Sequence, residues 1–409
     1  MFYSKQNRSI LYSEQRKSIH ELFQISKSET LVKIISFIVL QMSFWHNGIA
    51  DFISFGLLQW WNILQMGATL LVIIMFVIMK RMPSVVTGLL ISVKLLTTFS
   101  AVMNGIIIDM PELTRYIAIV LIIDYYSSYL DQLIRPLMLI FEFMVYYNCY
   151  VLLNAERDIY GGFFASLGYD NDFTRYMLVA YLVAILYNQI TGRRIRSLCL
   201  IIVVHITLIY PMVGTAVTAL FVIDCIILIA YWRLGYFKFA HGLIVYLVLQ
   251  VSIVFFRLQN LFEFIIVGML GKDLTLTGRT DLWDKSIGKI KIMDHIIIGH
   301  GDMSQLFEKL VLGDVYCHNS FLEVLFRGGI VSMILWIVIV VVINRRVYNW
   351  LDRKTAAYCS AIFMGLWIVA LTESLLQFGV TASLFALINA ACQYAKYKTE
   401  IVMEHREWE

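Results

Sequence analysis

The chain contains 409 residues, of which 60% are hydrophobic and only 15% are charged. These proportions exclude an ordinary soluble protein of this length and indicate a lipid environment, in which helices satisfy their own backbone hydrogen bonds. The formal net charge is only +4, and we expect no nucleic-acid partner.

Apolar segments long enough to cross a bilayer, about 20 residues each, recur along the whole chain. We predict an all-α, polytopic membrane protein with about 12 transmembrane helices, forming one integral membrane domain over residues 1–409. The predicted spans are 31–49, 57–79, 85–103, 113–130, 133–153, 176–191, 197–210, 212–231, 240–256, 330–343, 356–373 and 377–395.

Lysine and arginine are concentrated in alternate connections between these spans. They occur in the N-terminal segment, in the even-numbered connections and in the C-terminal tail, whereas 47–56, 104–112, 209–211 and 374–376 contain none. Because cytoplasmic loops carry the excess of positive charge, both termini are predicted to be cytoplasmic. The odd-numbered connections then lie outside the cell.

The ninth connection, about 257–329, is much longer than the others and is predicted to be a structured extracytoplasmic loop. Within it, apolar residues recur at helical spacing over 281–293 and are interrupted by charged residues. This pattern is typical of a helix that lies on a membrane or protein surface. We expect the active site in this loop.

Arg279 comes just before this predicted helix, whose start is capped by Thr280 or Asp281. Free backbone N–H groups and the helix dipole favour an anion at such a position, and arginine binds phosphate through two parallel hydrogen bonds. The alternative is an interfacial arginine that extends to the membrane surface beside Trp283.

His318 lies shortly before another predicted helix. Ser320 and Glu323 form a capping-box pattern, which predicts a helix that begins near Phe321 and runs toward the tenth span. An imidazole just outside the first turn is suited to accept a proton from a sugar hydroxyl. The alternative is a surface histidine that helps to cap the helix.

The order of four short motifs in the loop resembles that of the O-antigen ligase and polysaccharide polymerase superfamily. The resemblance covers residues 277–330, and the remainder of the chain agrees only in helix number and topology. It implies a lipid-dependent glycosyltransferase with a GT-C-like architecture. The motifs are Gly278-Arg279-x-x-x-Trp283, Gly299-x-Gly301, His318-Asn319-x-x-Leu322-Glu323 and Gly328-Gly329-Ile330.

The resemblance also implies roles for individual residues. Arg279 is expected to bind the diphosphate of an undecaprenyl-diphosphate-linked oligosaccharide, and His318 to act as the base for the acceptor hydroxyl. No metal and no cofactor are expected, and transfer inverts the anomeric carbon. Supporting positions around the site are expected at Asn319, Glu323, Trp283 and Asp281.

One feature of the superfamily is missing. Its members often carry Ser-Arg in the short external turn that here reads Pro211-Met212-Val213-Gly214-Thr215. A second phosphate-binding arginine must therefore come from elsewhere, with Arg257 as the first candidate and Arg115 as the second. Asp170-Asn171-Asp172 offers paired carboxylates for a metal, but turn formation alone accounts for it.

Ionisable residues also occur inside the predicted spans, where they are expensive to bury and often functional. Pairing of Lys94 with Asp124 or Glu142 is one structural explanation, and a proton-coupled transporter is another. These residues are Lys94, Asp124, Glu142, His205 and Asp224, with Glu373 near an outer end.

We interpret the chain as a polysaccharide polymerase of the bacterial plasma membrane that extends a capsular polysaccharide or exopolysaccharide from lipid-linked repeats at the outer face. Alternatives are a ligase that moves the finished glycan to another acceptor, and a transporter or flippase of lipid-linked oligosaccharide. Expected partners are membrane lipid, the flippase and the chain-length regulator of the same pathway. A carrier would be expected to show two related halves, which the single long loop disfavours.

Overall fold

The computed structural model describes residues 30, 32–44, 54–78, 82–158, 162–232, 238–264, 267, 278–291, 296–302 and 317–407. This part of the chain is almost entirely helical. Its one sheet is a small antiparallel hairpin of β1 (Phe164–Ala165) and β2 (Gly168–Tyr169). The prediction of an all-α protein is confirmed, whereas the GT-C-like architecture stays a prediction.

A helix lies at every predicted span, within the residues that the structure describes. Five helical segments are long and apolar enough to cross a bilayer, and two more, Val32–Phe44 and Phe239–Phe255, are apolar but shorter. A multi-pass membrane protein is therefore confirmed, and the number of twelve crossings stays a prediction. The five are Gly56–Ile78, Val85–Met103, Ser127–Leu153, Gly214–Tyr231 and Ser320–Trp350.

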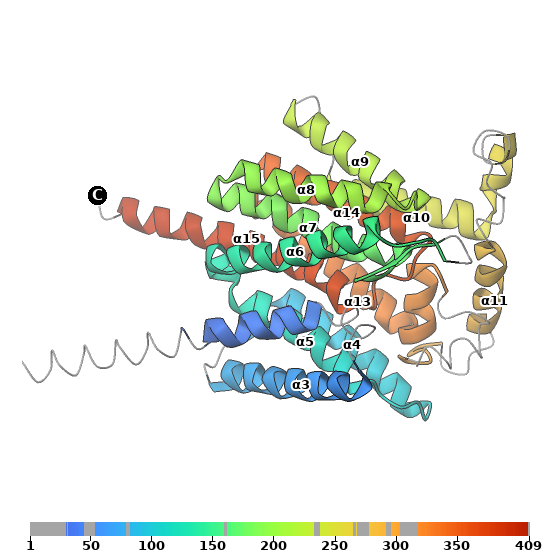
Figure 1. The fold of residues 1–409 in the computed structure, drawn as a ribbon, viewed down its shortest axis with the longest axis horizontal. Coiled ribbons are helices and arrows are strands. Elements are labelled where there is room, and N and C mark those ends of the chain that lie inside the picture. Colours follow the sequence, from blue (N-terminus) through green and yellow to red (C-terminus); the bar gives the residue numbers. More distant parts are fainter. Residues whose placement is uncertain are drawn as a thin grey trace, which may run out of the picture.

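The labelled helices follow the chain in order. They are α3 (Phe55–Ile78), α4 (Val85–Met103), α5 (Met110–Tyr125), η1 (Ser127–Tyr129), α6 (Leu130–Leu153), α7 (Asp170–Thr191), α8 (Arg194–Ile209), α9 (Gly214–Tyr231), α10 (Phe239–Leu249), the π-helix η2 (Gln250–Phe255), η3 (Leu258–Phe262), α11 (Arg279–Lys291), α13 (Ser320–Trp350), α14 (Arg353–Ala370) and α15 (Gly379–Glu407). Most of them run along one common direction (Figure 1).

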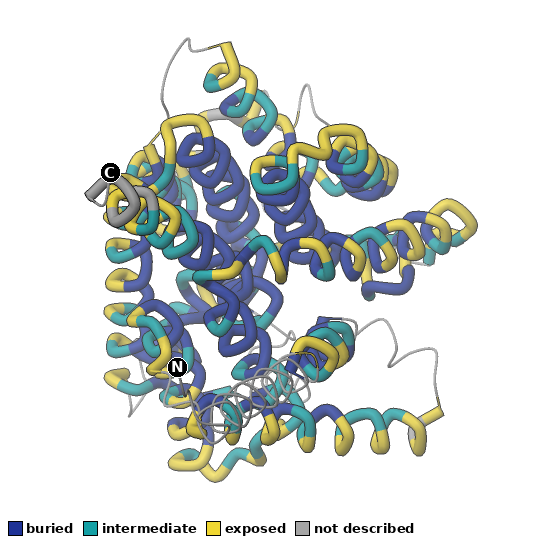
Figure 2. The backbone as a smooth tube through the Cα atoms, turned by 90° about the vertical axis from the view of Figure 1, so that its left-hand side faces the viewer, coloured by how far each residue is buried: buried dark blue, intermediate teal, exposed yellow. Residues whose placement is uncertain are grey.

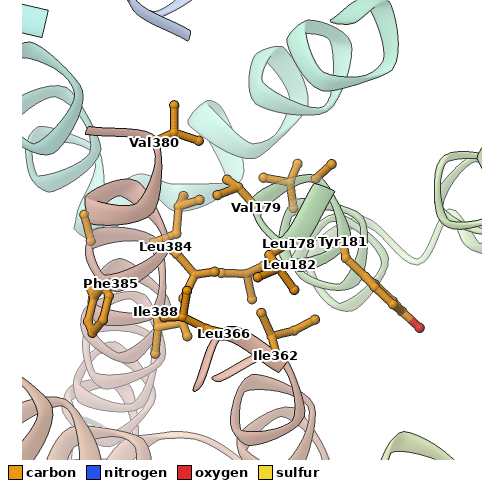
Figure 3. Packing of buried hydrophobic residues seen from close by; sticks show 14 of the residues in the cluster. Leu178, Val179, Tyr181, Leu182, Ile362, Leu366, Val380, Leu384, Phe385 and Ile388 are labelled. Atoms are coloured by element: carbon orange, nitrogen blue, oxygen red, sulfur yellow. The ribbon is translucent and has the colours of Figure 1, made fainter. Parts of the chain in front are cut away.

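Helix α7 lies at the centre of the bundle. From Tyr176 to Tyr187 its side chains are apolar or aromatic on every face, a pattern typical of a helix surrounded by other helices, and every residue from Phe173 to Tyr187 is buried. Figure 3 shows Leu178 and Leu182 of α7 beside Leu366 of α14 and Leu384 of α15. The periphery is exposed instead, as Figure 2 shows in yellow. In a membrane that outer surface contacts lipid, so close packing between helices holds the centre together.

Helix α11 lies across the ends of the bundle helices, at the end opposite to the last turn of α15 (Figure 1). The predicted topology requires this separation, because it places the long loop outside and the C-terminus in the cytoplasm. The observed start of α11 is Arg279, preceded by Gly278 at φ +80°. Thr280 and Asp281 therefore lie inside the helix, and the prediction that one of them caps it was wrong.

Helix α13 is broken at Gly329, whose φ of +61° and ψ of −162° are accessible in practice only to glycine. The break leaves backbone N–H and C=O groups of α13 without helical partners. The turn at 296–302 provides hydrogen-bond partners for these groups. The segment that carries the Gly299-x-Gly301 motif is therefore hydrogen-bonded to the segment that carries the Gly328-Gly329-Ile330 motif. The hydrogen bonds run from Ile330 N to Ile296 O (3.1 Å), Val331 N to Ile297 O (3.1 Å), His300 N to Phe326 O (2.9 Å) and Gly301 N to Arg327 O (2.7 Å).

We expect Gly301→Ala to unfold or severely destabilise this region. A Cβ at Gly301 would lie 2.0 Å from the backbone nitrogen of Ala101, and its φ of +91° is strained for any other residue. Overpacking of this kind costs on the order of 3 kcal/mol or more. The measurement is the thermal midpoint of the purified protein. The control is Gly288→Ala, where a Cβ meets nothing within 4 Å, and an equal midpoint for both variants would contradict the expectation.

Candidate functional site

The carboxylate of Glu373 joins the two residues that the sequence singles out most strongly. Its Oε1 accepts a hydrogen bond from Nη2 of Arg279, and its Oε2 lies 3.1 Å from Nδ1 of His318. Glu373 is buried, and the other two side chains are partly exposed. The guanidinium of Arg279 and the imidazole of His318 thus contact the same carboxylate, although the two residues are 39 positions apart in the sequence.

The backbone around His318 is fixed by its neighbours. Its φ of +46° is unusual for a residue with a side chain and requires support from the surrounding structure. The indole Nε1 of Trp283 donates a 3.1 Å hydrogen bond to the His318 carbonyl, and the Trp283 side chain is fully buried. Helix α11 is thereby attached to the start of α13. Trp283 is therefore enclosed by protein and holds the backbone of His318.

A second set of contacts holds Glu373 in place. The hydroxyl of Ser320 donates to the Glu373 carbonyl at 2.7 Å and accepts from Leu375 N at 2.9 Å. These bonds attach the connection between α14 and α15 to the first turn of α13. The carboxylate of Glu373 therefore cannot shift without disturbing the residues next to His318.

Asn319 is the N-cap of α13, since its side chain accepts a 3.0 Å hydrogen bond from Leu322 N. The prediction of Ser320 as the cap was wrong by one residue. The Asn319 amide also pairs reciprocally with the amide of Gln250 at 3.0 Å and donates to Leu371 O at 2.8 Å. Gln250 begins the π-helix η2, a form of helix that is rare and often found at functional sites.

Glu323 is buried and forms hydrogen bonds to residues next to the site. Its Oε2 accepts from Cys317 N at 2.9 Å and from the Ser374 hydroxyl at 3.0 Å, and its Oε1 accepts from Nε of Arg327. In a capping box this carboxylate would instead accept from the N–H of the cap residue. Glu323 therefore braces the two residues that flank His318 and Glu373 in the chain, Cys317 and Ser374.

Alternating charges continue from Glu323 toward the bundle interior. Arg327 lies 3.3 Å from Asp302, and Lys94 lies 2.7 Å from Asp302 and 3.2 Å from Glu112. The suggested pairing of Lys94 with Asp124 or Glu142 was therefore wrong, because Lys94 pairs with Asp302 and Glu112 instead. Burial raises the pKa of Asp302, but the charges of Lys94 and Arg327 outweigh burial and hold that pKa below its usual value.

The other ionisable residues inside the spans have separate partners. Asp124 accepts hydrogen bonds from Ser84 and Thr87 near the start of α4. A histidine–aspartate pair links α8 and α9, since Nε2 of His205 lies 2.8 Å from Oδ2 of Asp224. The remaining pair joins Arg196 to Glu142.

Arg257 is attached to α11 beside the cluster. Its Nη2 donates to the Thr280 carbonyl at 2.9 Å and to the Asp284 carboxylate, and its guanidinium lies 5.5 Å from the centre of the Trp283 ring. Its Nη1 is buried without a hydrogen-bond partner among the described residues. Arg257 therefore adjoins the cluster through Trp283 and retains an unused donor.

Two further predicted residues, Arg115 and Asp281, have other surroundings. Arg115 projects from α5, where its Nη1 lies 3.4 Å from Asn62 Oδ1 of α3. Asp281 is exposed in the first turn of α11, where a negative charge stabilises the helix dipole. The structure thus brings Arg257 to the cluster and attaches Arg115 to another helix.

The paired carboxylates at Asp170 and Asp172 form the start of α7. Asp170 accepts hydrogen bonds from the backbone N–H of Phe163 and Asn171, and Asp172 lies 3.1 Å from Arg175. Burial is the main cause that raises the pKa of Asp170. Across the described part of the chain, no three histidine, cysteine or acidic side chains gather closely enough to hold a metal ion.

Glu373 is the site residue that sequence reasoning undervalued. Its position was noted only as an ionisable group near the outer end of a span. The available signal was an acidic residue enclosed by apolar sequence, which in a membrane protein is functional by default. Its two partners lie 94 and 55 residues away in the chain, so no local pattern reveals them.

Fold and site together define a helical membrane protein with an arginine, a carboxylate and a histidine clustered at one end of the bundle. No protein-family model matches the sequence. The chain is similar to the exopolysaccharide production protein ExoQ of Rhizobium meliloti (strain 1021), with 31% identity over 88 residues. The match covers 19% of this chain and 20% of that protein, so it concerns a small part of both.

Proposed function

We propose that this protein is a glycosyltransferase that polymerises lipid-linked repeat units at the outer face of a bacterial plasma membrane. The observation that carries the proposal is the shared contact of Arg279 and His318 with Glu373. An anion-binding group and a proton acceptor meet there at the end of a membrane bundle. The similarity to an exopolysaccharide production protein and the resemblance of the loop motifs support the same class of substrate.

His318 acts as the general base in this mechanism. In this mechanism Nδ1 of His318 carries the proton that faces Glu373, and Nε2 accepts the proton of the acceptor hydroxyl. The acceptor oxygen then forms a bond to the anomeric carbon as the bond from that carbon to the diphosphate oxygen breaks. The electron pair leaves with the lipid diphosphate, and Glu373 stabilises the imidazolium. Displacement from the opposite face inverts the anomeric configuration.

Arg279 and Arg257 stabilise the leaving group. Arg279 is the first residue of α11, and Arg257 donates a hydrogen bond to the Thr280 carbonyl in the first turn of the same helix, whose dipole also favours a diphosphate. Negative charge on the bridging oxygen increases as the glycosidic bond breaks, so donors placed beforehand lower the barrier. The unused Nη1 of Arg257 supplies one such donor. This arrangement replaces the Ser-Arg motif that is absent from the turn at 211–215.

The glycan that accumulates when the gene is deleted tests the proposal against a ligase and a carrier. We expect single repeat units on lipid diphosphate, exposed at the outer face, because a polymerase joins repeats after their transfer across the membrane. The measurement is mass spectrometry of extracted lipid-linked glycans, with accessibility to an added glycosidase. Long chains still on lipid would indicate a ligase, and repeats confined to the inner face a flippase. Either result would remove the polymerase proposal.

A further inference from the structure

Gln250 is a buried amide at the junction of α10 and the π-helix η2. It is only 1% exposed, and both of its polar side-chain atoms are paired with the amide of Asn319 at 3.0 Å. Burial of an amide without hydrogen bonds is expensive, so this reciprocal pair fixes the two residues relative to each other. Asn319 directly follows His318 in the chain and caps α13. Gln250 is therefore attached to the residue next to the proposed base.

The π-helix also sets the direction of Arg257. Helix η2 runs from Gln250 to Phe255, and Arg257 follows it in the left-handed conformation, with φ 53° and ψ 35°. A π-turn contains one residue more than an α-turn, so it rotates the residues after it by about 100° around the helix axis. Beyond this rotation Arg257 lies against α11, where it donates to the Thr280 carbonyl. The direction of Arg257 thus depends on where the π-turn begins, which is at Gln250.

Contacts between side chains close a ring through the candidate site. The carbonyl of His318 accepts from Nε1 of Trp283 at 3.1 Å, and the Trp283 ring lies 5.5 Å from the guanidinium of Arg257. Helix η2 leads back from Arg257 to Gln250, whose amide partner is the residue after His318. Arg257 and His318 are two of the three non-glycine residues with positive φ in the described part of the chain, and such conformations persist only where the surroundings determine them. Both therefore depend on this ring, which Gln250 closes.

We propose that Gln250 is a positioning residue, which holds the base His318 and the leaving-group donor Arg257 in one arrangement. The inference rests on the proposed function for the roles of those two residues. Transfer requires the acceptor hydroxyl and the diphosphate to be aligned on opposite faces of the anomeric carbon, and misplacement of a group by about 1 Å can lower a rate on the order of 100-fold. Because Gln250 is buried, it acts through these two residues and not on the substrate itself.

Gln250→Met tests this role, since methionine keeps the length of the side chain and removes both hydrogen bonds to Asn319. The Asn319 amide retains its bonds to Leu322 N and Leu371 O, so we expect the variant to fold. The measurement is the rate of lipid diphosphate release by the purified full-length protein in lipid vesicles, with the native lipid-linked repeat unit as substrate. We expect kcat to fall at least about tenfold, with a smaller change in KM.

A matched control and a double variant separate positioning from loss of stability. Gln65 is a fully buried amide of α3 whose Nε2 donates to Thr69 at 3.1 Å, so Gln65→Met also removes a buried hydrogen bond but should leave kcat unchanged. In the Arg257→Ala background, we expect the loss caused by Gln250→Met to be at least about threefold smaller, because the arginine that it positions is gone. A kcat of Gln250→Met equal to that of Gln65→Met, or an equal loss in both backgrounds, would overturn the proposal.

A readout without substrate distinguishes failure of this inference from failure of the proposed function. In NMR of the protein with isotope-labelled histidine, the imidazole signal of His318, identified by its loss in His318→Ala, should shift or broaden in Gln250→Met, while that of His205 on α8 stays unchanged. If the wild type transfers no glycan but this change is seen, the proposed function falls and the positioning of His318 stands. If the wild type transfers glycan and needs Arg279 and His318, but Gln250→Met changes neither the signal nor kcat, only the positioning inference falls.

Discussion

Cells that carry Arg279→Ala are expected to make at least about 100-fold less polymer than the wild type and to accumulate single repeats on lipid diphosphate. Arg279 is the cation that contacts Glu373, and it is placed at the start of α11 where a diphosphate is favoured. Arg279→Lys keeps the charge but loses the two-pronged hydrogen-bonding geometry, so we expect an intermediate loss. The measurement is polymer per cell, normalised to the amount of protein in the membrane.

Lys285→Ala is the matched control for this prediction. Lys285 is an exposed cation on the same helix, and its replacement removes equal charge without touching the Glu373 cluster. We expect normal polymer from this variant. Wild-type polymer from Arg279→Ala at an unchanged protein level would show that the arginine has no part in the chemistry.

Replacement of His318 is expected to have an effect of similar size. His318→Ala removes the proton acceptor, and loss of a general base lowers kcat by about 10²–10⁴-fold. Glu373→Gln preserves a hydrogen-bond acceptor but removes the charge that stabilises the imidazolium, so we expect a fall in kcat with a smaller change in KM. The measurement is the rate of glycan transfer by the purified protein over a range of pH.

The pH profile distinguishes a base from a merely structural histidine. Wild-type activity should fall toward acid pH as the imidazole becomes protonated, and the residual activity of His318→Ala should lack this fall. His241→Ala, an exposed histidine on α10, should match the wild type at every pH. An acid limb that persists in His318→Ala would assign the titration to another group.

Helix positions were predictable because they depend on local composition. A run of apolar residues long enough to cross a bilayer has one stable backbone conformation there, and every predicted span coincides with a helix in the part that the structure describes. The start of α13 shows the limit of such reasoning. Asn319 and Ser320 are both good caps, and the contact of Ser320 with the distant Glu373 carbonyl decides between them.

Two residues of the candidate site were predictable from the sequence, whereas the role of Glu373 and the contacts among the three were not. Arg279 and His318 stand out from local motifs, and the structure brings both of them to Glu373. The partner of Lys94 could not be identified, because Asp302 lies 208 positions later in the numbering of the chain. That pairing depends on how the 296–302 turn packs against α4, which is a property of the folded bundle.

Reconstitution of the purified protein in lipid vesicles with the native lipid-linked repeat unit as the sole glycan tests the central claim most directly. We predict that the wild type forms glycan chains of several repeats and releases lipid diphosphate in step with each new bond. Arg279→Ala and His318→Ala should form neither product. Absence of chain growth with the wild type, or equal growth with both variants, would contradict the assignment of catalysis to the cluster around Glu373.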